Sequence, residues 1–275
     1  MQTKRVITAI ILTLVFLVIA RRLSTRHPES LSSDAAGIRL EHRSVTEQVE
    51  GRDITFTAKL HGDPSLQVNI KYGSSTQAME RQTTMARVAD SLSAVLPGGQ
   101  RGDRIYYTLT VTDSAGSTLT TLPGSNTPAL LIKIKGEVAG WLLVAHILCM
   151  FASFFFVALA GLGAVELLRG AGQVEVLVRN SLWALNLIFI GGFPLGMAVA
   201  YQAFGVAWGG IPYGWDITDN KTLITFLFWL VAVLAGLRGL RHGGPAKADN
   251  HLRYAMLVML CVVVTLSVYL IPHSL

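Results

Sequence analysis

Long apolar runs alternate with polar segments along this chain of 275 residues. A helix needs about 20 apolar residues to cross the hydrocarbon core of a bilayer. The pattern therefore predicts four membrane spans. Together with their loops, these spans form a predicted four-helix transmembrane domain over 138–275. The predicted spans are Val138–Leu162, Ser181–Ala203, Leu223–Leu240 and Tyr254–Ile271.

A shorter apolar run, Val6–Ala20, follows Lys4 and Arg5. This run allows two interpretations, because it is short for a span. It is either a signal peptide over 1–20, with a small-residue cleavage site ending at Ala20, or a retained signal anchor. The two arginines that directly follow Ala20 favour the anchor.

Between the first run and the spans, residues 38–135 show short alternating runs separated by turn residues, after a polar linker over 21–37. Regular short strands of this kind predict an all-β sandwich, and Ile105–Asp113 followed by Gly116 resembles a late strand of immunoglobulin-like and fibronectin-type modules. The predicted fold is a membrane α-helical bundle of four to five transmembrane helices with an inserted immunoglobulin-like β-sandwich. The runs are Gly37–Val45, Asp53–Leu60, Leu66–Tyr72, Thr84–Val88, Ser91–Leu96, Arg104–Thr112, Ser117–Leu122 and Ala129–Ile134.

Basic residues in short loops predict the orientation of the spans, because Lys and Arg concentrate on the cytoplasmic side. The loops after the spans Val138–Leu162 and Leu223–Leu240 are basic. The loop after Ser181–Ala203 instead carries Asp216 and Asp219 with only Lys221. We therefore expect a multi-pass protein of a bacterial inner membrane with a cytoplasmic N-terminus. Residues 21–137 and the loop 204–221 are expected to be extracytoplasmic.

Composition narrows the functional classes. The net charge of +6 comes without a basic patch interleaved with aromatic residues, which argues against nucleic-acid binding. Cys149 and Cys261 both fall in predicted spans, where a free cysteine packs as a small apolar residue. The sequence contains no Cys-x-x-Cys-His motif, which would indicate covalently attached heme. It also contains no nucleotide-binding, serine-hydrolase or zinc-protease motif that would indicate an enzyme class.

The loop from Trp208 to Lys221 has an unusual composition for a connection between spans. It contains Trp208, Tyr213 and Trp215 together with several glycines, and Asp216 follows directly. Flat aromatic rings, and glycines that let a ligand come close to the backbone, suit a planar ligand such as a porphyrin at the membrane face. The alternative is an interfacial belt, in which Trp and Tyr anchor helices at the level of the headgroups.

Four short segments carry a family resemblance: Gly191–Met197, Ala207–Gly209, Gly214–Asp216 and Lys221–Thr225. Together they resemble the tryptophan-rich WWD segment of the heme-handling cytochrome c assembly proteins, over residues 187–240. The resemblance implies a heme b bound at the outer membrane face and a role in cytochrome c assembly.

The chain departs from the family pattern at three places. Ile211 and Pro212 lengthen the loop, and Tyr213 stands where the family usually has a Trp. Thr218–Asn220 replaces the Pro-Lys-Glu of the family.

Histidines on either side of the loop complete the expected site. His146 lies in the second apolar run and His273 follows the last one, in the family's order, and both are candidate axial ligands of heme iron. Trp208, Tyr213 and Trp215 would pack against the macrocycle, Lys221 would pair with a propionate, and Asp216 would orient an imidazole. Without heme, His146 would be a helix-packing residue and His273 part of a terminal tail. His42 and His61, in the β region, are expected to be solvated.

Two functions follow from this pattern. The first is a heme-binding or heme-handling membrane protein that presents heme to an apocytochrome. The second is a non-catalytic scaffold or assembly subunit of a membrane complex, whose β-sandwich binds another subunit and whose aromatic loop anchors it in the bilayer. The sequence does not decide whether any reaction is catalysed.

Overall fold

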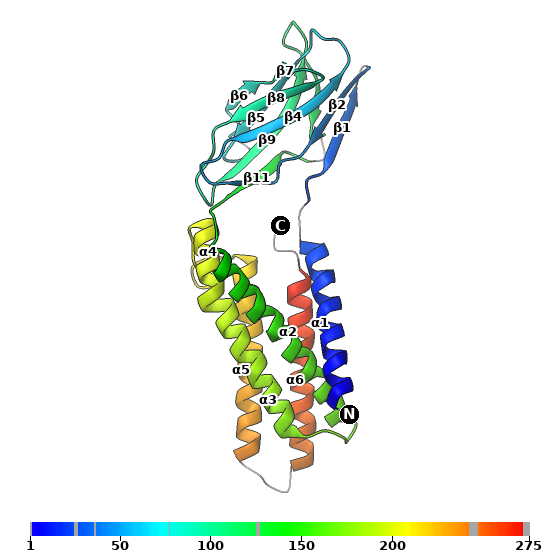
Figure 1. The fold of residues 1–275 in the computed structure, drawn as a ribbon, viewed down its shortest axis with the longest axis vertical. Helices are drawn as coiled ribbons and strands as arrows, with labels where there is room; N and C mark the ends of the chain where they lie inside the picture. Colours follow the sequence, from blue (N-terminus) through cyan, green and yellow to red (C-terminus); the bar gives the residue numbers. More distant parts are fainter. Residues whose placement is uncertain are drawn as a thin grey trace. The chain divides into compact units, whose positions relative to one another are not determined.

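The computed structural model describes residues 2–24, 27–35, 37–76, 78–124, 127–241 and 247–271. The chain divides into two compact units, which are described separately (Figure 1). The helical unit comprises Met1–Thr25, Val138–Tyr201 and Val206–Leu275. The β unit comprises Arg26–Glu137 and Gln202–Gly205.

Five stretches of helix in the described part of the chain are long and apolar enough to cross a membrane. All four predicted spans are among them, and the fifth is Thr3–Leu23, with 21 residues. A multi-pass membrane architecture is therefore consistent with the structure. The elements are α1 (Gln2–Ser24), α2 (Gly140–Leu168), α3 (Val174–Ile190), the π-helix η1 (Gly191–Leu195), α4 (Gly196–Phe204), α5 (Ile217–Arg241) and α6 (Lys247–Leu270).

The first helix is longer than the apolar run Val6–Ala20 suggested, because basic residues extend it at both ends. It packs against α2 and α6. The rings of Phe16 and Phe154 lie 4.9 Å apart, and the guanidinium of Arg5 lies 3.1 Å from the carboxylate of Glu166 on α2. These contacts make α1 an integral part of the helical unit.

The core of the helical unit is formed by apolar residues of α2, α3, α5 and α6, with Trp229 fully buried. The Nε1 of Trp229 on α5 donates a hydrogen bond to the hydroxyl of Thr265 on α6 at 2.9 Å. The N–H group of this buried indole is therefore satisfied. Cys261 lies in this core, in the packing position expected from the sequence. Cys149 is half-buried, and both cysteines are free thiols.

The span Val174–Phe204 is not a regular helix, because residues 191–195 form a π-helix. Pro194 has no backbone N–H and its ring disturbs the preceding turn, which the wider π-turn accommodates. Asn186, on α3 before this π-helix, does not bond to the backbone near Pro194. It instead donates to the carbonyl of Leu182, one turn back in its own helix, at 2.8 Å.

The β unit contains two sheets. One has the strand order β1-β2-β4-β8-β7, and the other has the order β3-β11-β9-β5-β6 with β10 paired to β9. Among the described strands, all pairings are antiparallel except that of β3 with β11. The strands are β1 (Ser30–Ala35), β2 (Ile38–Arg43), β3 (Glu47–Val49), β4 (Ile54–His61), β5 (Gln67–Gly73), β6 (Arg81–Thr84), β7 (Ala86–Val88), β8 (Ser91–Leu96), β9 (Arg104–Thr112), β10 (Thr118–Leu122) and β11 (Leu130–Lys135).

The predicted linker over 21–37 is wrong, since α1 continues to Ser24 and β1 occupies Ser30–Ala35. The sequence concealed β1 because it is an edge strand made largely of serines, with only one large apolar side chain. Its backbone nevertheless pairs with β2 along its whole length.

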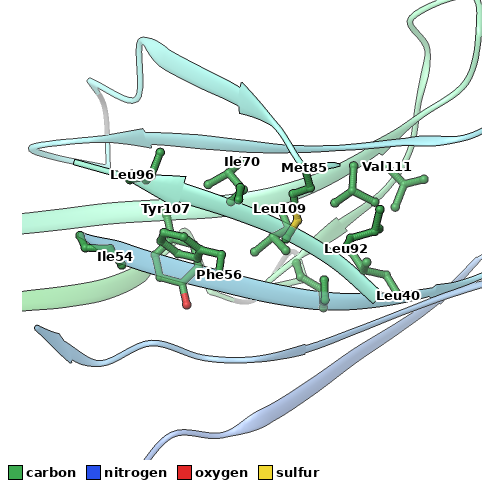
Figure 2. Close-up of a cluster of buried hydrophobic side chains, with 14 of the residues drawn as sticks. Leu40, Ile54, Phe56, Ile70, Met85, Leu92, Leu96, Tyr107, Leu109 and Val111 are labelled. Carbon is green, nitrogen blue, oxygen red and sulfur yellow. The ribbon is translucent and has the colours of Figure 1, made fainter. Parts of the chain in front are cut away.

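One apolar core contains residues from both sheets (Figure 2). Phe56 of β4 and Tyr107 of β9 meet there edge to face, with their ring centroids 5.0 Å apart. His42 was expected to be solvated but is only 3% exposed, because the alternation of β2 places it on the same inward face as Leu40. His61 is exposed, as expected.

Candidate functional site

Trp208 attaches the aromatic loop to η1. Its ring stacks on Phe193 with a centroid distance of 5.4 Å and an angle of 17° between the planes. Its Nε1 donates to the carbonyl of Ile211 at 3.1 Å, which closes the turn that follows. Trp208 therefore has a structural role in the loop, whatever else the loop contacts.

Asp216 is the N-cap of α5. Its Oδ1 accepts hydrogen bonds from the backbone N–H groups of Thr218 at 2.8 Å and Asp219 at 3.1 Å. These are two of the N–H groups that a helix leaves without an internal partner at its start. The carboxylate expected to orient an imidazole is thus bonded to the helix that follows it.

The first turn of α5 also holds the loop in shape. The Oδ2 of Asp219 accepts from the N–H of Gly209 at 2.6 Å, and the Oδ1 of Asn220 accepts from the N–H of Ile211 at 2.8 Å. Two backbone donors of the loop are therefore satisfied by side chains ten and nine residues later. Sequence reasoning missed both side chains, although each follows a recognisable N-cap aspartate.

Tyr213 and Trp215 are the exposed aromatic residues of the loop. They are the most exposed of the large hydrophobic residues in the described part of the protein, at 84% and 83%. Neither ring takes part in an aromatic pair within the described residues. The loop thus presents two aromatic side chains that the helical unit itself does not cover.

Lys221, one turn into α5, is only 3% exposed. Its ammonium donates to the backbone carbonyl of Ile271, which directly follows α6. The side chain expected to pair with a propionate is therefore inside the helical unit and connects α5 to the end of α6.

His146 lies on α2 and is half-buried. Its Nδ1 is 2.9 Å from the carbonyl oxygen of Gly191, the first residue of η1. A carbonyl oxygen can only accept, so the Nδ1–H donates and the Nε2 of the neutral ring carries a lone pair. Gly196 lies beside the ring, since a Cβ there would be in van der Waals contact with the Cε1 at 3.6 Å.

The π-helix connects His146 to the aromatic loop. Gly191 accepts the hydrogen bond of His146, and Phe193, two residues later, stacks on Trp208. The structure thus brings two of the predicted site residues, His146 and Trp208, to the same short segment. Sequence reasoning missed the contribution of Phe193 and of the Gly191 carbonyl. His273 lies outside the described residues.

The metal-binding capacity of this site is limited. The residues that the structure describes contain no group of three or more His, Cys, Asp and Glu side chains placed to hold a metal ion. A metal ion held entirely by protein ligands is therefore not supported there. Heme differs, because the porphyrin supplies four nitrogen ligands and one imidazole is enough to hold the iron.

Comparison with known proteins does not assign the chain to a family. No protein-family model matches it, and no curated protein matches it. Among solved structures it overlaps with the β-1,2-glucanase from Parabacteroides distasonis, with 12% sequence identity and a TM-score of 0.23. The overlap covers 85% of this chain and 35% of the glucanase chain, and such a TM-score does not indicate a shared fold.

Proposed function

We propose that this protein is a membrane subunit that binds one heme b beside the aromatic loop, with the Nε2 of His146 as an axial ligand. The observation that carries the proposal is the hydrogen bond from the Nδ1 of His146 to the Gly191 carbonyl. Histidines that bind metals commonly donate their other N–H to a carbonyl, which fixes the tautomer and the ring orientation. Among the residues that the structure describes, the Nε2 of His146 has no hydrogen-bond partner, and it is the basic nitrogen of the ring.

The loop supplies the surroundings that such a group requires. Tyr213 and Trp215 offer exposed aromatic faces for packing against a porphyrin, and Trp208 fixes the start of the loop on η1. In this proposal Asp216 and Lys221 act indirectly, by capping α5 and by fixing its first turns to the end of α6. A second ligand, if the iron has one, is assigned to His273.

The proposal extends to the rest of the chain. The resemblance to heme-handling cytochrome c assembly proteins favours a site at the outer face of a bacterial inner membrane. There the heme, when bound, would supply iron chemistry or be passed to an apocytochrome. The β unit would then be an immunoglobulin-like module that docks this acceptor.

The test is the absorption spectrum of the full chain purified in detergent, oxidised and reduced, after expression with added heme precursor. We expect b-type Soret and α bands in the wild type that are strongly reduced in His146→Gly. Added imidazole should restore the bands in that variant, because it replaces the lost ligand but not the lost packing. His61→Gly, which removes an exposed histidine of the β unit, is the matched control and should keep its heme. A wild type without heme, or a His146→Gly protein with unchanged bands, would reject the proposal.

A scaffold subunit without a cofactor is the second candidate. The observation that favours it is the loop itself, whose backbone is held by Asp219 and Asn220 while Tyr213 and Trp215 remain exposed. A rigid loop with two exposed aromatic side chains at the end of a span is typical of an interfacial anchor. Under this alternative the wild type contains no heme, and Trp215→Ser weakens membrane integration without any spectral change.

A further inference from the structure

The outer face of the first sheet of the β unit contains an open groove with a volume of about 490 Å³. This volume falls in the usual range of small-molecule sites, about 300–1,000 Å³. The groove crosses β1, β2 and β4 and reaches the start of β8. Its lining residues include Ser30, Ser32, Arg39, Glu41, Arg43, Thr57, Lys59 and Ser91.

Strand register places the polar side chains in rows. Ser30 of β1 is opposite Arg43 of β2, and Ser32 is opposite Glu41. Glu41 is in turn opposite Lys59 of β4. Because side chains alternate along a strand, all of these residues are on one face. Arg43 and Lys59 are diagonal neighbours, a relation that separates Cα atoms by about 7–8 Å.

The charges of the groove are not balanced within it. Arg39 binds the carboxylate of Glu41 at 2.9 Å and reaches that of Asp34 at 3.9 Å. Arg43 and Lys59 are both exposed, and neither takes part in an ion pair among the described residues. Two cations thus face the groove, while its one lining carboxylate is already bound to the third cation.

We propose that this groove binds a phosphate monoester of a soluble small molecule. The guanidinium of Arg43 presents a planar set of donors that matches two phosphate oxygens, and the ammonium of Lys59 adds a second charge. The hydroxyls of Ser30, Ser32 and Thr57 are donors for the remaining oxygens. The lining has no Phe, Tyr or Trp side chain for stacking a base or a sugar, and its one imidazole, that of His42, is buried in the core, so the phosphate is the recognised group.

The proposal is independent of heme binding, since every lining residue belongs to the β unit. It is tested by isothermal titration of the full chain in detergent with glycerol 3-phosphate at low salt. Arg43→Gln and Lys59→Gln should each weaken binding about tenfold or more, because charge-assisted hydrogen bonds are lost. Lys71→Gln removes an exposed cation from β5 of the other sheet and should bind like the wild type. Unchanged thermal unfolding of each variant confirms that the groove is intact.

Three results would overturn the proposal. The first is the absence of saturable binding to the wild type. The second is equal weakening in all three variants, which would mean a response to overall charge and not to the groove. The third is binding to nanodiscs containing phosphatidic acid but not to glycerol 3-phosphate, which would make the ligand a lipid headgroup.

Discussion

The hydroxyl group of Tyr107 donates a hydrogen bond to the Nε2 of His42 over 3.0 Å, from one sheet of the β unit to the other. The direction follows from the other ring nitrogen, since the Nδ1–H of His42 donates to the carbonyl of Thr57 at 2.8 Å. The Tyr107 oxygen also accepts from the N–H of Val45 at 2.9 Å. One phenol therefore satisfies a buried imidazole and a backbone donor within the apolar core.

Replacing this phenol should destabilise the β unit alone. In Tyr107→Phe the ring remains, but the Nε2 of His42 and the N–H of Val45 lose their partner, at a cost of about 2 kcal/mol. Pulse proteolysis in urea, read on fragments of the β unit, measures the change. All five tryptophans lie outside the β unit, so the tryptophan fluorescence of the helical unit is an internal control that should not shift. A variant as stable as the wild type would contradict the assigned bonds.

Stability of the β unit should depend on pH through His42. Burial lowers the pKa of His42 from 6.5, and the bond to Thr57 opposes this only in part. Above pH 6.5 the imidazole is neutral in both states, so stability is at its full value. As the pH falls below 6.5, the unfolded chain binds a proton that the folded chain resists, and stability is lost until the lowered pKa is passed.

The matched comparison uses two histidines of the same unit. His42→Gln should flatten the dependence below pH 6.5, whereas His61→Gln, at an exposed position, should retain it. Urea unfolding at a series of pH values, again read by proteolysis of the β unit, provides the measurement. An unchanged slope in His42→Gln would assign the dependence to other groups.

Close approach of α5 to η1 depends on Gly192. A Cβ at this position would lie 2.4 Å from the Cγ2 of Thr222, a stiff, branched side chain. Gly192→Ala should therefore destabilise the helical unit by about 1–3 kcal/mol. Thr222→Ser deletes the colliding methyl group, so the double variant should recover much of the loss.

Unfolding in SDS, followed by the fluorescence of the tryptophans, measures these differences. Gly239→Ala is the control, because a Cβ at that position of α5 meets nothing within 4 Å. If the losses of stability in the two single variants simply add in the double variant, the methyl group of Thr222 is not what a Cβ at position 192 collides with.

The Arg5–Glu166 pair predicts that α1 is retained as a membrane helix. The guanidinium of Arg5 also donates to the carbonyl of Leu159 at 2.9 Å, so it fixes the start of α1 near the end of α2. The intact mass of the purified protein should include residues 1–20. Glu166→Gln should lower stability by about 1 kcal/mol, since the pair is only partly buried. A mature chain that begins after Ala20 would contradict this prediction.

The sequence by itself determined the elements whose signal is local. Runs of apolar residues predicted the spans, and alternation with turn residues predicted most strands, because both patterns depend on neighbouring positions. It also identified the aromatic loop, and the N-cap role of Asp216 could have been read from its place before a helix. The choice of His146 as a candidate site residue also came from the sequence, and both its place in a site and its heme role are still predictions.

Only the tertiary structure decided which groups meet. The burial of His42 depends on Tyr107, 65 residues away, and the strand over Ser30–Ala35 exists because β2 supplies its hydrogen bonds. The location of Lys221 depends on the end of α6, and the tautomer of His146 depends on a carbonyl of η1. Partners so distant in sequence leave no local pattern, because a side chain's burial and hydrogen bonds are fixed only when the whole unit packs.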